Sequence, residues 1–89
     1  MKTYELATNN DARASFYGKA RVIDSWSENG KIELWSYGTH VATVYPGAKN
    51  KAEVYGTYSQ TTLRHIKEFL LQNGFKAINK AQIVKDYIK

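Results

Sequence analysis

The chain has 89 residues, of which 43% are apolar and 24% are charged, and its formal net charge is +5. This length supports one domain with one core, and the composition is that of a globular protein rather than a disordered one. The chain has no cysteine, which excludes disulfides and thiolate metal sites, and no apolar run is long enough for a signal core or a membrane span. We therefore expect a single domain over residues 1–89 that is cytoplasmic and does not contact a membrane.

The first two thirds of the chain have the alternation and the β-branched content of strands. We expect a short strand over residues 4–8 and then a brief helical turn, capped by Asn10 or Asp11, through Ala14. Residues 20–27 and 31–37 should pair as a hairpin, because the Asn29-Gly30 dipeptide between them suits a type I′ turn.

Residues 31–37 alternate between two faces of the second expected strand. Ile32 and Leu34 should point into the core, which leaves Lys31, Trp35 and Tyr37 together on the other face. Two more strands are expected downstream. Gly38 marks a tight turn or a bulge before residues 39–45, Pro46-Gly47 ends that run, and residues 52–56 form the last strand.

The last third of the chain has the period of helices. Ser59 can cap a helix over residues 59–73, in which Leu63, Ile66, Phe69 and Leu70 form an apolar stripe and Arg64, Lys67 and Glu68 face water. Asn73-Gly74 should end this helix, with Phe75 folding back on it, and Asn79 should cap a second helix over residues 79–88. The expected fold is α+β: an antiparallel meander of three or four strands packed by these two helices.

Three segments of the sequence resemble a known family. They are Ser15-Phe16-Tyr17-Gly18-Lys19-Ala20, Ser36-Tyr37-Gly38-Thr39 and the run from Tyr58 to Phe75, YSQTTLRHIKEFLLQNGF. They look like a family of short uncharacterised proteins from phages and other mobile elements of Gram-positive bacteria. The resemblance implies a mobile-element origin, with the chain acting inside a bacterial host cell, and it carries no activity that can be transferred residue by residue.

The reactive side chains offer little for catalysis. Two histidines without cysteine or an HExxH motif do not make a metal site, and no nucleotide-binding or nucleophile motif occurs, so we expect neither a metal nor a cofactor. The enzyme class that survives is a metal-independent ribonuclease using His40, His65 and Arg64 with tyrosines. We expect a protein that is not an enzyme, with the ribonuclease as an alternative.

Charge and aromatic residues point to a binding surface. Residues 61–89 hold six bases against two acids, whereas residues 1–60 are nearly balanced, and aromatic residues make up 13% of the chain. An exposed strand face that carries aromatics and cations can stack bases or form the centre of a protein interface. If the helix returns along the meander, the loop lysines and the helix cations should bracket this face. The expected binding residues are Lys31, Trp35, Tyr37, Lys49, Lys51, Arg64 and Lys67.

Three function classes follow from these patterns. The first is a binding protein that contacts nucleic acid or a nucleoprotein through the basic, aromatic surface. The second is an inhibitor of a host protein, such as an anti-CRISPR or another host-takeover factor, and the third is the ribonuclease. The second face of the sheet could instead be covered by the N-terminal segment or by a second copy of the chain in a homodimer.

Overall fold

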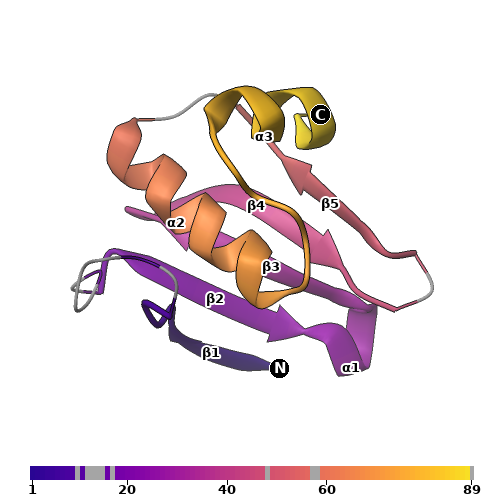
Figure 1. Ribbon diagram of the computed structural model, residues 1–89. Coiled ribbons are helices and arrows are strands. Elements are labelled where there is room, and N and C mark those ends of the chain that lie inside the picture. The colour runs from indigo at the N-terminus through magenta and orange to yellow at the C-terminus, as the bar shows by residue number, and fades with distance from the viewer. Residues whose placement is uncertain (10, 12–15, 17, 48, 57–58, 89) are drawn as a thin grey trace.

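A five-stranded antiparallel sheet forms one layer of the molecule. The computed structural model describes residues 1–9, 11, 16, 18–47, 49–56 and 59–88. Within them the strands follow one another across the sheet in chain order, as a simple meander (Figure 1). The strands are β1 (Lys2–Glu5), β2 (Ala20–Ser25), β3 (Lys31–Ser36), β4 (Thr39–Tyr45) and β5 (Lys51–Val54).

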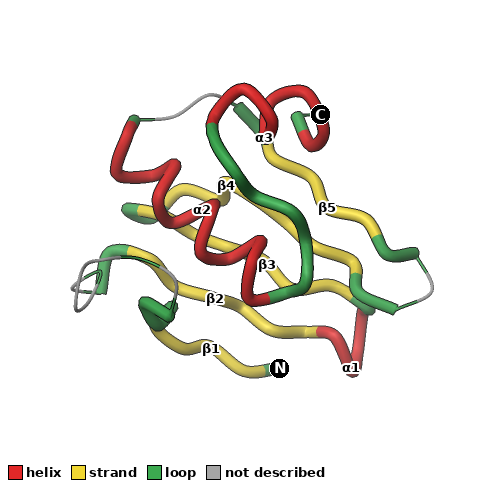
Figure 2. The backbone as a smooth tube through the Cα atoms, viewed as in Figure 1, coloured by secondary structure: helices red, strands yellow, loops and turns green. Residues whose placement is uncertain are grey.

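Helices α2 (Gln60–Gln72) and α3 (Lys80–Tyr87) form the second layer, and both lie on the same side of the sheet (Figures 1 and 2). The core lies between the two layers. Leu34 of β3 and Val44 of β4 are fully buried there, as are Ile66 and Leu70 of α2. The α+β fold predicted from the sequence is confirmed, and the sheet has one strand more than the predicted three or four.

The helices begin and end where local chemistry indicates. The Ser59 side chain accepts a hydrogen bond from the Thr62 amide, and the Asn79 side chain accepts one from the Gln82 amide at 2.9 Å. At the end of α2, the Phe75 amide donates to the Leu70 carbonyl across Gly74, which has a φ of 82°. These caps bind backbone groups that have no partner inside the helix.

Two connections between neighbouring strands depend on glycine in different ways. Asn29 ends a single helical turn, α1 (Trp26–Asn29), and only Gly30 takes the left-handed conformation, so the predicted type I′ turn at Asn29-Gly30 is wrong. The connection between β3 and β4 is a two-residue turn at Tyr37-Gly38, where φ is 51° and 79°, which agrees with the predicted tight turn at Gly38. Positive φ at both central residues is what a type I′ turn requires.

Several element boundaries also differ. The first strand is β1 rather than residues 4–8, and the last strand ends at Val54 rather than at residue 56. The predicted turn from Asn10 to Ala14 falls outside the described residues except for Asp11. Glu68 does not face water, since only 1% of it is exposed. Its carboxylate accepts a hydrogen bond from Gln72 at 2.8 Å, which explains how the core accommodates the carboxyl group.

None of the helices in the described part of the chain has the length and apolar content needed to cross a membrane.

Candidate functional site

The side of the sheet opposite the helices carries the candidate site, and we call it the open face. Ser36 points to the side of the sheet that the helices cover, because its hydroxyl contacts Thr62 and His65 of α2 at 3.0 and 2.8 Å. Alternation along β3 then directs Lys31, Glu33 and Trp35 away from the helices. No helix in the described ranges covers this face, as Figure 1 shows.

Aromatic rings lie side by side across three strands of the open face. The rings of Trp35 and His40 are stacked, with centroids 5.1 Å apart and planes inclined by 11°. Tyr55, just after β5, meets the other side of His40 edge-on at 5.0 Å. The bulge between β3 and β4 next to Trp35 sets His40 directly opposite it in the register. We call Trp35, His40 and Tyr55 the aromatic row.

Hydrogen bonds hold the row in place. The Trp35 indole donates to Glu33 Oε1 at 3.0 Å, and the Tyr55 hydroxyl donates to Thr43 Oγ1 at 2.6 Å. The same Thr43 oxygen lies 2.8 Å from His40 Nε2. Rings fixed in this way lose little conformational freedom when a ligand stacks on them, which favours binding.

Glu33 is the carboxylate nearest the centre of the row. Partial burial raises the pKa of Glu33, but hydrogen bonds from Trp35 and Lys31 and the charges of His40 and Lys31 outweigh that effect. The resulting pKa is lower than the ordinary value of 4.5. Glu33 is therefore ionised at neutral pH, and Lys31 lies 3.3 Å from its second oxygen.

A hollow of about 480 Å³ adjoins Trp35 on the side of β2. Its lining includes Ile23, the cations Lys19 and Arg21, and Trp35 itself. Arg21 stands directly opposite Trp35 in the β2–β3 register. The hollow thus combines an aromatic wall, an apolar side chain and two positive charges.

Sequence reasoning did not include Lys19, Arg21, His40 or Tyr55 among the binding residues. The predicted pairing of residues 20–27 with 31–37 could have placed Arg21 on the same face as Trp35, because cross-strand neighbours share a face. Tyr55 and His40 carried no such signal, since their position depends on the bulge and on the end of β5.

The structure keeps part of the predicted binding set together. Lys31 and Trp35 lie on the open face as predicted. Lys49 and Lys51 lie at one end of it, where their ammonium groups are 5.2 and 5.6 Å from the ring centroid of Tyr45. These lysines therefore add positive charge at the Tyr45 end of the open face, several residues along the strands from the aromatic row.

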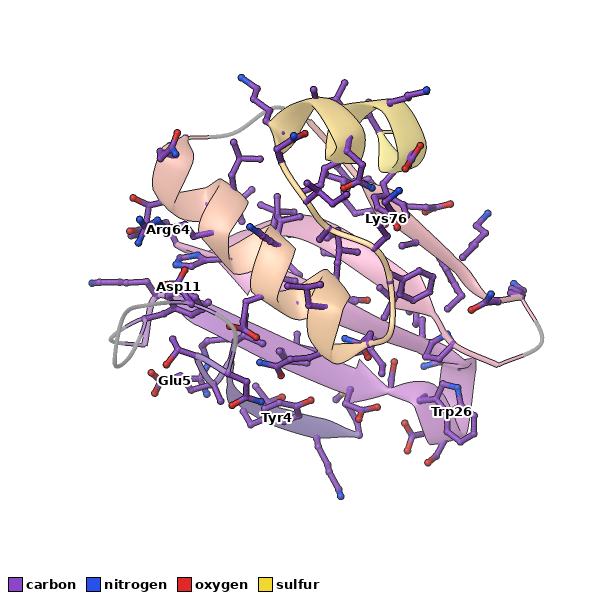
Figure 3. The ribbon with its side chains drawn as sticks, viewed as in Figure 1. Tyr4, Glu5, Asp11, Trp26, Arg64 and Lys76 are labelled. Carbon is purple, nitrogen blue, oxygen red and sulfur yellow. The ribbon has the colours of Figure 1, made fainter. Side chains whose placement is uncertain are left out.

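The other three predicted binding residues are placed differently. Tyr37 belongs to the turn after β3, where its ring centroid lies 5.7 Å from that of His65, and it also lines the hollow beside Trp35. Arg64 and Lys67 belong to α2, on the far side of the sheet, where Arg64 lies 3.6 Å from Asp11 (Figure 3). The expectation that they bracket the open face is wrong.

The two histidines of the ribonuclease alternative lie on opposite sides of the sheet. His40 is part of the aromatic row, whereas His65 is 1% exposed, with Nδ1 bonded to Ser36 and its ring against Phe16 at 4.5 Å. The structure therefore does not bring the two histidines together on one surface. Within the described ranges, no three histidine, aspartate or glutamate residues gather closely enough to hold a metal ion.

A protein-family model matches residues 4–85, which is most of the chain, and its description is a family of unknown function, DUF8033. Neither a curated protein nor a solved structure shows a significant match.

Proposed function

We propose that this chain, which belongs to the DUF8033 family of unknown function, binds single-stranded nucleic acid on the open face of its sheet and is not an enzyme. The observation that carries the proposal is the aromatic row, fixed on a sheet face that no helix in the described ranges covers, with Lys19 and Arg21 beside it and Lys49 and Lys51 at the far end of the same face. Stacking platforms combined with a positive groove are how proteins bind single strands with little dependence on sequence.

The hollow beside Trp35 is the proposed binding site for a base. A flat base entering it would stack on the Trp35 side chain and touch Ile23, while Arg21 and Lys19 reach the phosphates on either side of the nucleotide. Stacking of this kind contributes about 1–3 kcal/mol per base. Lys49 and Lys51 lie near Tyr45 at the other end of the open face, where a longer strand that turns along β4 would meet them.

Trp35 also supplies the test. In a Trp26→Phe background it is the single tryptophan, so its emission reports on the open face directly. We expect short oligonucleotides, such as oligo-dT and oligo-U, to quench this emission in a saturable way at low salt. Trp35→Ala, followed by the anisotropy of a labelled oligonucleotide, should weaken binding by about 1–3 kcal/mol because one stacked base is lost.

The control variant is Trp26→Ala. Trp26 is 51% exposed, and its indole bonds to Pro46 in the turn beyond β4, away from the aromatic row. Its replacement should leave oligonucleotide affinity unchanged. If no oligonucleotide quenches Trp35 even at low salt, or if both tryptophan variants weaken binding equally, the proposal is wrong.

One observation favours a second candidate function, an inhibitor that grips a host protein. Glu33 is paired with Lys31, and Glu53 is paired with Lys51 at 3.1 Å, so the open face has less net positive charge than its lysines alone indicate. Aromatic residues among paired charges are also typical of protein interfaces. In that case Trp35→Ala would cost about 2 kcal/mol or more of affinity for the host protein, as expected for a hot spot.

The place of action is part of the proposal and rests on the sequence resemblance alone. We propose a protein of phage or mobile-element origin that acts in the cytoplasm of its bacterial host. Affinity purification from such a host, with and without nuclease treatment, separates the two candidate functions. Material that nuclease releases supports nucleic-acid binding, and a host protein that nuclease leaves in place supports the inhibitor.

A further inference from the structure

A second hollow lies in the helical layer, on the opposite side of the molecule from the open face. It has a volume of about 440 Å³ and is bordered by α2, by the segment before α3 and by the first residues of α3. We infer that this groove binds an amphiphilic anion, which is a small molecule with an apolar chain and a carboxylate or similar head group.

Part of the lining of the groove is apolar, and we call these side chains its floor. Leu63 and Leu71 of α2 line it together with Ile78 and with Ile83 of α3. The core stripe of α2 consists of other residues, which are almost wholly buried against the sheet, whereas Leu63 and Leu71 stay half-buried. Ile78 is 55% exposed. Part of the apolar surface of the helical layer thus stays in contact with water, and a ligand chain lying in the groove would cover it.

The rim of the groove is positive. Lys67 and Lys80 line it, both are exposed, and neither forms an ion pair with another described residue. Two carboxylates are present, but Asp11 pairs with Arg64 and Glu68 accepts a hydrogen bond from Gln72. Neither carboxylate forms an ion pair with the two lysines, so the charge that an incoming ligand meets at the rim is positive.

Floor and rim together define the ligand chemistry. A neutral apolar molecule would make no charged contact with the lysines, and a small inorganic anion would leave the apolar side chains of the floor exposed to water. A molecule with an apolar chain and an anionic head group would contact both the floor and the lysines. The volume of the groove lies in the range of small-molecule sites, about 300–1,000 Å³. This inference does not depend on the proposed nucleic-acid binding, because the sheet separates the two surfaces.

Dodecanoate is a suitable probe. We expect a titration below its micelle concentration, followed by methyl and amide NMR spectra of the whole chain, to shift the signals of Leu63, Leu71 and Ile78 saturably and to leave Trp35 unmoved. Dodecyl maltoside, with the same chain and no charge, should give much weaker shifts at the same concentrations.

Paired variants test the head-group contact. Lys67→Ala/Lys80→Ala should weaken dodecanoate binding about tenfold or more, because contacts to a charged group are lost. Lys2→Ala/Lys85→Ala removes the same charge from exposed lysines that do not line the groove, and it should bind dodecanoate as the native chain does. Circular dichroism of both variants establishes that each is folded.

Three outcomes would overturn the inference. Dodecyl maltoside could shift the groove residues as strongly as dodecanoate, which would mean that charge is not recognised. Both lysine pairs could weaken binding equally, which would mean that only net charge matters. An acidic amphipathic peptide could shift the groove signals where dodecanoate does not, which would make the groove a docking surface for protein. Oligonucleotide binding is unaffected by any of these results, so the two proposals fail separately.

Discussion

Glu33 links ionisation to the geometry of the open face. Its carboxylate accepts the Trp35 indole hydrogen bond and has a pKa below 4.5 in the folded chain. A lowered pKa means that the carboxylate stabilises the fold fully above its ordinary pKa of 4.5 and loses that contribution as the pH falls through the lowered pKa of the folded chain. The contacts of Glu33 are therefore weakest in acid.

Glu33→Gln provides the measurement. The neutral amide keeps the shape of the side chain but not its charge. We expect this variant to be less stable than the native chain near neutral pH, and we expect the difference to shrink at an acid pH, as the Glu33 carboxylate takes up a proton on passing through its lowered pKa. Urea unfolding at the two pH values measures the difference. An equal difference at both values would mean that ionisation of Glu33 contributes nothing to stability.

Single residues also show where sequence reasoning fails. The predicted alternation of side chains between the two faces is correct from Lys31 to Ser36, but it does not extend to Tyr37. Tyr37 breaks it because a φ of 51° places it in the turn, where its ring lies 5.7 Å from that of His65 and still lines the hollow beside Trp35. Alternation holds only inside a strand, and the end of a strand depends on the turn that follows it.

At the scale of elements, α2 is the best-predicted part of the fold. Ile66 and Leu70 are wholly buried, but Leu63 is only half-buried because it lines the groove toward α3. We expect Ile66→Ala and Leu70→Ala each to cost about 2–5 kcal/mol of unfolding free energy, from lost burial and an unfilled cavity. Leu63→Ala should cost clearly less. Thermal or urea unfolding of the three variants checks the order, and equal losses would contradict the burial pattern.

The helices were predictable because their signals are local. Ser59, Asn79 and Gly74 act within a few residues of their own position, and the structure uses each as predicted. The strand ends were less predictable because they depend on partners far along the chain. Asn29-Gly30 shows this, since the helical turn of α1 replaces the hairpin turn that the dipeptide favours when considered alone.

The whole molecule has two separate surfaces, and no local pattern in the sequence reveals the separation. Lys49 and Lys51 project near Tyr45 at one end of the open face, whereas Arg64 and Lys67 belong to the helical layer. The sequence predicts that all four cations bracket the open face, because a helix that returns along a meander could bring its cations to the rim of the sheet. The strand register and the position of α2 against the sheet determine which surface each cation occupies. Both are tertiary features.

This separation gives a charge-matched prediction for oligonucleotide binding. Lys49→Ala/Lys51→Ala should weaken binding similarly for all sequences and reduce the dependence of log K on log salt by about 0.7 per lost phosphate contact on a single strand. Lys67→Ala/Lys80→Ala removes the same charge from the other surface and should leave that slope unchanged at about 0.1 M salt, where distant exposed charges are screened. Anisotropy titrations over a range of salt concentrations measure both slopes. If the two pairs lower the slope equally, the nucleic acid responds to net charge alone and the open face is not its binding site.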